Sequence, residues 1–471
     1  MSASPASGSQ ERTDAPTRIV ILGGGFGGVS VARELEKRLP AAANVRITLV
    51  NRENFFLFTP MLHEVAASDL DITHIVNPLR KLLNRTFLFT GLVESIDTAS
   101  KTVRVSHAGG EHEHDLEYDH LVIALGVITN FYDIPGLAER AVTMKSLGDA
   151  IGLRNRMIEH LEEADFECNA GARDPLLTFV VAGGGFAGVE TVAAMHDFLE
   201  SALRFYPSLG RKSEHKRVRV VLVHSGAFLL PELGEDLGRY TQERLAERGV
   251  EVILGARVTG HQNDAIILSD GRSVPARTIV WTAGTSANPA LDALPCMKSR
   301  GRITVDGCLR VPGLENVWAL GDCASIPDHT TGGTYPPTAQ HAQREGVRVA
   351  RNIVATMRAE PLQQFSFSTI GLLASIGQRT GVANILGMKF SGFIAWWLWR
   401  TIYLSKLPRL EKKLRVALDW TLDVLFSKDM VQFGTWRAPT ISSAEVTDTV
   451  VRPPVTPVIE TIGDIRLRAV V

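Results

Sequence analysis

Two short β-branched runs along the chain each lead directly into a cluster of glycines and then into a helix-like sequence. The first copy covers residues 18–31 (RIVILGGGFGGVSV), and the second covers residues 178–189 (TFVVAGGGFAGV). Another apolar run follows each copy, at residues 45–50 (VRITLV) and 218–223 (VRVVLV). This pattern predicts the same unit of strand, glycine turn, helix and strand twice in one polypeptide.

The glycines of both copies have the spacing G-x-G-x-x-G. They are Gly23, Gly25 and Gly28 in the first copy and Gly183, Gly185 and Gly188 in the second. The first glycine permits a tight turn, the second lets the backbone approach a pyrophosphate, and the third lets the helix pack closely on the strand. The helix N-terminus stabilises the phosphate charge. One copy is a weak signal, because ordinary α/β folds also contain glycine-rich turns, but two copies with their following strands indicate two bound nucleotides.

Three further apolar runs end in small or acidic residues, as suits a backbone that approaches a cofactor closely. These runs are residues 118–126 (YDHLVIALG), 278–284 (TIVWTAG) and 317–324 (VWALGDCA). The residues at their ends are Ala124 with Gly126, Gly284, and Gly321 with Asp322. An aromatic-rich segment, residues 54–67 (NFFLFTPMLHEVAA), has two interpretations: it either walls a ring system or belongs to the ordinary core.

Together these motifs carry a family resemblance. The glycine clusters and the ends ALG, TAG and GDCA resemble flavoproteins with two dinucleotide-binding domains, in which FAD sits in a split first domain and a nicotinamide cofactor in an inserted second one. Within that superfamily, residues 17 to 435 resemble the type II NADH:quinone oxidoreductases, which are single-subunit respiratory NADH dehydrogenases that pump no protons. The most specific matches are residues 59–66 (TPMLHEVA), 183–190 (GGGFAGVE) and 335–346 (YPPTAQHAQREG).

The resemblance implies an α/β fold with two Rossmann-like domains and a C-terminal amphipathic helical region. The expected segments are a disordered tail at 1–16, the first part of the FAD domain at 17–140, the nicotinamide domain at 141–290, the second part of the FAD domain at 291–384, membrane-associated helices at 385–435 and a tail at 436–471. Hydride is expected to pass from the nicotinamide to the flavin, and two electrons from the flavin to quinone. This chemistry needs no metal site and no acid–base triad in the protein.

The resemblance also assigns cofactor-binding positions. For FAD they are Gly23, Gly25, Phe26, Gly27, Gly28, Asn51, Arg52, Val93, Ala124, Gly126, Gly321 and Asp322, with Ala339 and Gln340 beside the flavin ring. For the nicotinamide cofactor they are Gly183, Gly185, Gly188, His224 and Gly284. Asn51 and His224 stand where such domains usually carry a ribose-binding acid. NADH is the expected substrate, and the absence of Glu at position 224 leaves NADPH open.

Two regions are implied to carry the reaction. Glu190 matches the family's glutamate near the nicotinamide and flavin, although an acid early in a helix also complements the helix dipole. The family's quinone segment, A-Q-x-x-x-Q, is matched by Ala339 and Gln340, with Arg344 in place of the last Gln. Ile370 stands where many members carry Lys. We expect Gln340 to face the quinone, and Arg344 to donate a hydrogen bond to a quinone carbonyl.

The C-terminal region combines tryptophan with basic charge. Residues 390–404 (FSGFIAWWLWRTIYL) hold three tryptophans, and residues 385–415 hold seven basic residues and one acid. A spanning helix needs about 20 apolar residues, so this segment is predicted to dock on an anionic membrane surface. Leucines recur at helical spacing from Leu410 to Leu425. Alternatively, these helices cap the flavin domain or form a contact between two copies in a homodimer.

Composition limits the remaining functions. With 50 Lys and Arg against 51 Asp and Glu, the chain shows no electrostatic footprint of a nucleic-acid partner. Four scattered cysteines form no CxxC or CxxxxC pair, and residues 1–16 lack an apolar signal sequence, so we expect a peripheral protein on the cytoplasmic side of the cell membrane. Three alternatives stay open: a soluble NAD(P)H-dependent flavin reductase, a sulfide:quinone reductase, which needs catalytic cysteines, and a redox-sensing nucleotide-binding protein.

Overall fold

The structure is a computed structural model that describes residues 15–107, 110–209, 218–377 and 379–434. Of the expected N-terminal tail only residues 15 and 16 are described, and the expected tail at 436–471 lies outside the described residues. Within the described parts of the chain, no helix combines the length and the apolar character needed to cross a bilayer.

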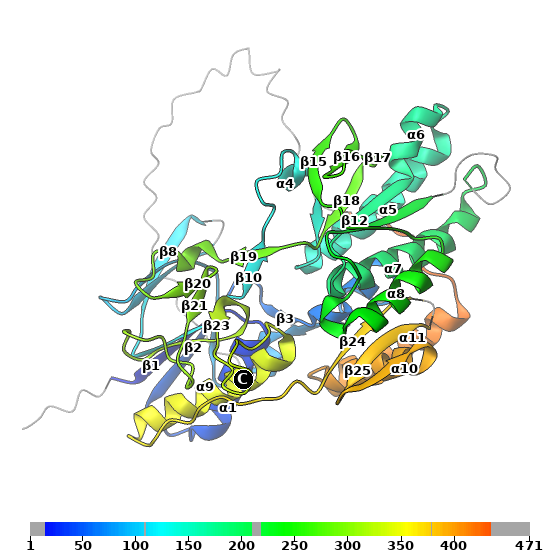
Figure 1. Cartoon of the computed structure of the whole chain (residues 1–471). Coiled ribbons are helices and arrows are strands. Elements are labelled where there is room, and N and C mark those ends of the chain that lie inside the picture. Colours follow the sequence, from blue (N-terminus) through cyan, green and yellow to red (C-terminus); the bar gives the residue numbers. More distant parts are fainter. Residues whose placement is uncertain (1–14, 108–109, 210–217, 378, 435–471) are drawn as a thin grey trace, which may run out of the picture. The chain divides into compact units, whose positions relative to one another are not determined.

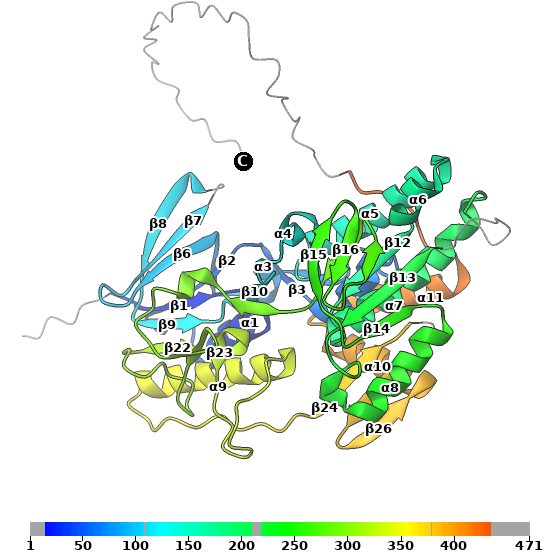
Figure 2. The same ribbon diagram turned by 45° about the horizontal axis from the view of Figure 1, so that its top comes forward.

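The first sheet is parallel and contains a strand from far along the chain, β22, which is labelled in Figure 2 but not in Figure 1. Its order is β22 (Val317–Ala319), β9 (His120–Ile123), β1 (Thr17–Leu22), β2 (Val45–Asn51) and β5 (Phe87–Thr90). β22 pairs with β9 and completes the sheet, so the first domain is split, as expected from the sequence. The inner strands β9 and β1 are buried on both faces, which is why they are near-continuous apolar runs, whereas Phe87 on the edge strand β5 is exposed.

Two helices pack closely together over this sheet. They are α1 (Phe26–Arg38) and α9 (Ala339–Met357), which lie side by side in Figures 1 and 2. A Cβ atom on Gly346 would come within 2.5 Å of the carbonyl oxygen of Gly27. The two helices approach this closely because position 346 is glycine.

The second sheet repeats the first and is inserted into it. Its order is β11 (Val142–Thr143), β18 (Thr278–Trp281), β12 (Thr178–Ala182), β13 (Arg219–His224) and β14 (Glu251–Leu254), all parallel. The helices α5 (Leu147–Phe166), α7 (Phe186–Ala202) and α8 (Glu235–Glu247) pack against it. The fold is therefore α/β with two Rossmann-like domains.

The two domains are joined by a pair of antiparallel strands, β10 (Val127–Thr129) and β19 (Thr285–Ala287). The expected boundary after residue 140 coincides with the end of α4 (Leu137–Arg140), and the one after residue 290 falls inside the short helix η5 (Pro289–Leu291). Along the chain, β10 precedes the first of these boundaries and β19 precedes the second.

Smaller elements complete the two domains. The additional strands are β3 (Phe55–Leu57) with β4 (Val76–Pro78); β6 (Leu92–Asp97), β7 (Thr102–His107) and β8 (His112–Glu117); β15 (Val258–Gln262), β16 (Ala265–Leu268) and β17 (Ser273–Pro275); and β20 (Lys298–Ser299), β21 (Arg302–Thr304) and β23 (Ala324–Ser325). The additional helices are η1 (Thr59–Met61), α2 (Leu62–Ala66), α3 (Leu79–Leu82), α6 (Ala170–Leu176), η3 (Leu203–Phe205), η4 (Pro231–Leu233) and η6 (Gly321–Cys323).

The C-terminal region begins with a three-stranded antiparallel sheet, β24 (Gly371–Ser375), β25 (Gly381–Ile385) and β26 (Met388–Ser391). Two helices follow, α10 (Gly392–Lys406) and α11 (Leu410–Leu425). The expected boundary after residue 384 falls inside β25. The three strands pack against α10, so the sheet and the helices form one unit. β24 and β25 also contact α7 and α8, which brings this region against the second domain.

Helix α11 has an unusual distribution of polar and apolar residues. It buries Lys412, Val416 and Trp420, which follow one another at intervals of four residues on one face. The Nζ of Lys412 donates a hydrogen bond to the carbonyl oxygen of Thr73, 2.6 Å away. The leucines that recur at helical spacing lie on the exposed part of the helix: Leu410, Leu414, Leu418, Leu422 and Leu425.

Candidate active site

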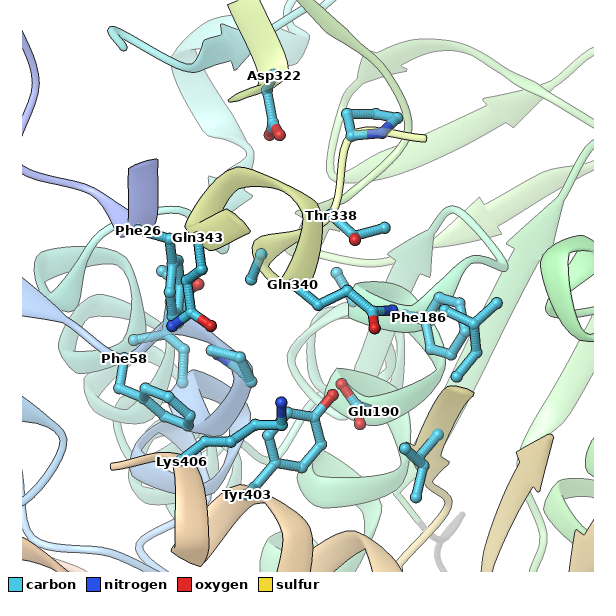
Figure 3. Close-up of a pocket in the computed structure, with 18 of the residues that line it drawn as sticks. Phe26, Phe58, Phe186, Glu190, Asp322, Thr338, Gln340, Gln343, Tyr403 and Lys406 are labelled. Carbon is cyan, nitrogen blue, oxygen red and sulfur yellow. The ribbon is translucent and has the colours of Figure 1, made fainter. Parts of the chain in front are cut away.

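A cavity of about 600 Å³ lies between the starts of α1 and α7 and the C-terminal region. Phe26 and Phe186, the first residues of α1 and α7, both line it. Figure 3 shows Thr338, Gln340 and Gln343 along one side of this cavity. The cavity therefore receives the N-termini of both Rossmann helices.

The glycine turns leave space at the two helix N-termini. Gly23 has a φ of 102° and Gly183 a φ of 117°, a region that side chains other than glycine rarely adopt. A Cβ atom on Gly28 would collide with the carbonyl oxygen of Gly23. In contrast, a Cβ atom on Gly25 or Gly185 would meet nothing within 4 Å.

These two open positions are the N-cap residues of α1 and α7, and no side chain caps either helix. The first backbone N–H groups of each helix therefore face open space, where the helix dipole favours negative charge. Both turns fit a pyrophosphate, one from FAD and one from the nicotinamide nucleotide.

Asn51 and His224 make equivalent hydrogen bonds in the two repeats. The backbone N–H of Gly24 donates to Asn51 Oδ1 over 2.8 Å, and that of Gly184 donates to His224 Nδ1 over 3.1 Å. Each side chain thus ties the end of the second strand to the glycine turn, and neither carries a negative charge. Burial lowers the pKa of His224, so its imidazole is neutral near pH 7. The neighbouring Arg52 is exposed and pairs with Glu53.

Gly321 and Asp322 lie in η6, where β22 ends. The backbone N–H of Gly321 donates to Glu345 Oε2 over 2.8 Å, and burial raises the pKa of that carboxyl to about 7. Asp322 lines the cavity on the side away from Tyr403 (Figure 3). Burial raises the pKa of Asp322, and the nearby Lys145 opposes that shift.

The other predicted cofactor positions have different surroundings. Gly126 lines the cavity, and Ala124 lies beside Gly23, whose Cβ atom would collide with the Ala124 carbonyl oxygen. Gly284 has a φ of 102° and faces the ring of Tyr132. Val93 lies on β6, in a peripheral sheet, and is not among the residues that line the cavity.

Glu190 is a buried carboxyl on α7, with 8% of its surface exposed. Its Oε1 accepts hydrogen bonds from the backbone N–H of Ser375 (3.1 Å) and from Nε1 of Trp399 (2.9 Å). Burial raises its pKa to about 8, against the effect of both bonds. Glu190 lies beyond the first turn of α7, so complementing the helix dipole does not explain it. At neutral pH it holds a proton in the wall of the cavity.

His63 faces the other oxygen of Glu190. Its Nδ1 lies 3.8 Å from Glu190 Oε2, and burial lowers the pKa of the ring to about 3. The imidazole is therefore neutral, and the contact between the two side chains is not an ion pair.

On α9, Gln343 rather than Arg344 faces the cavity. Gln340 lines it as expected and donates through Nε2 to the carbonyl oxygen of Gly371 over 3.1 Å. The Arg344 guanidinium stacks on Phe367, 4.0 Å from the ring centre, and donates to the carbonyl oxygen of Gln340. The structure thus does not bring Arg344 into the cavity, because the stacking and the helix backbone occupy its side chain.

The aromatic segment at 54–67 contributes residues both to the core and to the lining of the cavity. Phe56 and Met61 are buried in the core, while Phe58 lines the cavity. Phe58 also contacts Phe26 and Tyr403 edge-on, with ring centres 5.8 and 6.2 Å apart. It links α1 to α10 across the wall of the site.

Comparison with known proteins assigns the family. The family model for pyridine nucleotide-disulphide oxidoreductases matches residues 17–346, and the model for the NDH2 C-terminal domain matches residues 370–429. The chain is 32% identical to a type II NADH:quinone oxidoreductase of Mycobacterium tuberculosis, over 89% of this chain and 91% of that protein. It belongs to the type II NADH:quinone oxidoreductases.

Two further comparisons agree with this family. A probable NADH dehydrogenase of Dictyostelium discoideum is 31% identical, over 88% of this chain and 91% of that protein. The structure of NDH2 from Plasmodium falciparum in complex with NADH has a TM-score of 0.81, at 18% identity, over 88% of this chain and 99% of that one. This second likeness shows the same fold.

The cysteines separate this type II oxidoreductase from enzymes that use a thiol relay. All four are free, and none lines the cavity. Cys323 is buried, and burial raises its pKa to about 11, so it stays a thiol. Among the described residues, no group of three His, Cys, Asp or Glu side chains is arranged to hold a metal ion.

Several cavity residues were not predicted from the sequence of this type II oxidoreductase. Tyr403 and Lys406 enter the cavity from α10, and Lys145 enters it from the start of the second domain. This chain has Ile370 at the position where many family members carry Lys. Lys406, from α10, places an amino group in the cavity that Ile370 also lines. Gln343 alone had a sequence signal, since it follows Gln340 by three residues and shares its helix face.

Proposed function

We propose that this protein is an FAD-dependent enzyme that takes a hydride from NADH and passes two electrons to a quinone without pumping protons. The observation that carries the proposal is that Phe26 and Phe186, at the uncapped N-termini of α1 and α7, line one cavity. Two nucleotides held at these ends would bring their reactive rings to the same place. Bound FAD supplies the hydride acceptor and the two-electron donor.

Within this proposal, the first repeat binds FAD. The backbone around Gly25 holds the pyrophosphate, and Asn51 with Arg52 faces the adenosine end. Gly321 and Asp322 bind the ribityl side. The predicted positions Val93, Ala124 and Gly126 complete this set.

The second repeat binds NADH in the same way. The backbone around Gly185 holds its pyrophosphate, between Gly183 and Gly188, and Gly284 gives the nucleotide close backbone contact. His224 stands at the ribose position without a negative charge, so NADPH meets no carboxylate there.

We further propose that quinone binds against α9 and α10. Gln340, Gln343 and Lys406 bring N–H donors to the cavity, and donors of this kind bind quinone carbonyl oxygens. Ile370 and Leu372 offer an apolar wall to the ring. Glu190, protonated at neutral pH, is the acid that supplies a proton to the reduced quinone.

The exposed leucines of α11 and the apolar residues of α10 are proposed to attach the protein to a membrane. On α10, Phe393, Ile394 and Trp397 are exposed, and basic residues such as Arg409 and Arg415 lie near the leucines along the chain. A water-soluble protein rarely exposes so many large apolar residues on two adjacent helices. Apolar contact joined to basic charge fits an anionic lipid surface, from which quinone would reach the cavity.

We place this membrane surface on the cytoplasmic side, supported by the four unpaired cysteines, which are typical of a reducing compartment. The same exposed leucines could instead bury each other in a homodimer. In that case vesicles would not retain the protein, and its mass in solution would be double that of one chain.

One two-step experiment tests the function. NADH is added to the yellow purified protein without oxygen, and loss of flavin absorbance is recorded; a short-chain quinone is then added, with and without liposomes. Rapid bleaching followed by rapid return of the colour is the expected result.

The same experiment distinguishes the alternatives. A soluble flavin reductase with another acceptor would bleach with NADH but recover slowly with quinone. A redox sensor would turn over slowly with every acceptor. A sulfide:quinone reductase would bleach with sulfide. A protein that stays colourless when supplied with FAD would contradict the whole proposal.

A further inference from the structure

A second cavity, of about 520 Å³, adjoins the first one. Glu190 and His63 line both cavities and therefore form part of the wall between them. The second cavity is also lined by Glu200, Arg204 and Arg379, which are exposed residues, so it reaches the protein surface. Glu190 thus has the proposed quinone site on one side and a route to solvent on the other.

This second cavity has a polar lining. Its charged and titratable residues are His63 and Glu64 on α2, Asp69 in the loop after α2, Glu190, Asp197 and Glu200 on α7, Arg204 on η3, Arg379 after β24, Arg400 on α10, Asp423 on α11, and Lys428 after α11. A polar cavity of this size holds water, because its waters find several hydrogen-bond partners each.

Glu64 lies deep in the polar cavity, and among the described residues no cation is bonded to it. Its Oε2 accepts a hydrogen bond from Nε1 of Trp420 over 3.1 Å, and 6% of the residue is exposed. Burial raises its pKa to about 8, against the attraction of Arg400. A carboxyl with a purely structural purpose at such a depth would normally be paired. Glu64 instead holds a proton at neutral pH. When it loses that proton, its negative charge raises the pKa of Glu190.

Asp69 is the next carboxyl in the polar cavity. It forms an ion pair with Lys428, and burial raises its pKa to about 6 in spite of that pair. It therefore gains and loses a proton close to neutral pH more easily than Glu64 does.

His63 supplies a second, independent observation. It is 6% exposed, and its Nε2 has no hydrogen-bond partner among the described residues. Its Nδ1 faces Glu190. A buried ring nitrogen without a protein partner beside a polar cavity is a position for water.

The proposed reaction requires a proton from water. NADH, one proton and quinone give NAD⁺ and quinol: the hydride carries two electrons and one proton, so the second proton of the quinol must come from solvent. The wall of the first cavity is apolar at Phe26, Phe58 and Phe186, whereas Glu190 and His63 connect it to the polar second cavity.

We propose that the polar cavity is the proton uptake route of this enzyme, in which Asp69 and Glu64 pass protons from solvent, through water beside His63, to Glu190. Each turnover moves one proton inwards. Glu190 gives its proton to the reduced quinone and receives another from the water beside His63, to which Glu64 donates a proton. Glu64 and Asp69 touch no substrate and act only through Glu190. The route rests on the proposed function, since without quinone reduction no proton is consumed.

The test compares Glu64→Gln with wild-type protein in the two half-reactions. The glutamine keeps an oxygen that can accept the Trp420 hydrogen bond but cannot pass a proton. We expect flavin reduction by NADH at the wild-type rate and reoxidation by a short-chain quinone slowed about tenfold or more. We also expect a larger solvent deuterium isotope effect on reoxidation, and partial rescue of Glu64→Ala by formate, a small acid that fits the cavity.

Glu36→Gln is the matched control, because Glu36 is a partly buried carboxyl on α1 that lines neither cavity. It should change neither half-reaction. Reoxidation of Glu64→Gln with the wild-type rate, pH profile and isotope effect would overturn the route. Equal slowing of both half-reactions would also overturn it, because Glu64 would then maintain the structure of the whole site and would not act in proton supply to the quinone. If quinone fails to reoxidise even the wild-type protein, the proposed function itself is wrong.

Discussion

Trp399 on α10 donates its indole N–H to Glu190 on α7, with 2.9 Å between Nε1 and Oε1. This bond ties a helix of the C-terminal region to the acid that we place beside the quinone. The tryptophans of this segment therefore have different surroundings: Trp399 is buried in the site, whereas Trp397 is 54% exposed.

The first prediction concerns this bond. Trp399→Phe should lower the free energy of unfolding by about 1–3 kcal/mol, because a buried carboxyl loses a hydrogen-bond donor. The bond also lowers the pKa of Glu190, so its loss should move the pH profile of quinone reduction to higher pH. Urea unfolding of the FAD-loaded protein and kcat against pH measure both effects. Trp397→Phe is the control, and equal effects from both variants would contradict this role of Trp399.

A second prediction follows from the buried carboxyls Glu190 and Glu64, whose pKa values are both about 8. Such a group binds its proton more tightly in the folded protein, so its stabilising contribution is complete below the unfolded pKa, near 4, and declines as the pH rises to about 8. The decline is about 1.4 kcal/mol per pH unit for each group that titrates. Glu190→Gln should make unfolding free energy less dependent on pH between about 5 and 8.

Glu36→Gln provides a control of opposite sign for that measurement. Backbone N–H groups of residues 84–86 and the Thr86 hydroxyl lower the pKa of Glu36 in the folded protein, although burial opposes them. Its contribution is therefore present above the unfolded pKa and is lost only in acid. The raised pKa of Glu190 would be refuted if Glu36→Gln changed the pH dependence of the unfolding free energy between pH 5 and 8 and Glu190→Gln left it unchanged.

The third prediction separates the two nucleotide sites. Gly25→Ala and Gly185→Ala each add a methyl group where no protein atom lies within 4 Å, so the fold should tolerate both. The methyl group takes the space proposed for a pyrophosphate. Gly25→Ala should lose FAD on gel filtration, while Gly185→Ala should stay yellow and show a KM for NADH raised at least about tenfold. Retention of FAD by Gly25→Ala would argue against the assignment of the first turn.

The fourth prediction concerns the choice of nucleotide. His224→Glu puts a carboxylate where it can bond the ribose 2′-hydroxyl of NADH and repel the 2′-phosphate of NADPH. The ratio of kcat/KM for NADH to that for NADPH should rise about tenfold, which corresponds to 1.4 kcal/mol. Asn51→Asp, at the same place in the other repeat, should leave this ratio unchanged. If both substitutions change it alike, His224 does not mark the nicotinamide nucleotide site.

The fifth prediction concerns membrane docking. Leu414→Glu combined with Leu418→Glu puts two negative charges on the exposed stripe of α11 and should release the protein from anionic vesicles in a sedimentation assay, without loss of FAD. Met297→Glu, at an exposed apolar residue elsewhere, is the control. These substitutions are sharper than removal of residues 388 onward, which would also delete Trp399 and Trp420. A double variant that still sediments like wild type would refute the docking face.

The sequence by itself determined the two Rossmann units and their glycine turns. These features are local, because a strand, a glycine at positive φ and a helix start follow one another within a few residues, as at Gly23 and Gly183. The sequence motif alone therefore predicts the local geometry of the turn. The match of residue types also singled out Glu190 and Gln340, which line the same cavity.

Only the tertiary structure decided which side chains share that cavity and which face water. Tyr403, Lys406 and Trp399 reach the site because α10 folds back against α7, a contact between segments far apart in sequence. Helical spacing alone shows the leucines of α11 as one stripe but not that the opposite face, with Lys412, is the buried one. Burial also sets the charge of each carboxyl, since the energy of an ion depends on its surroundings and not on its residue type.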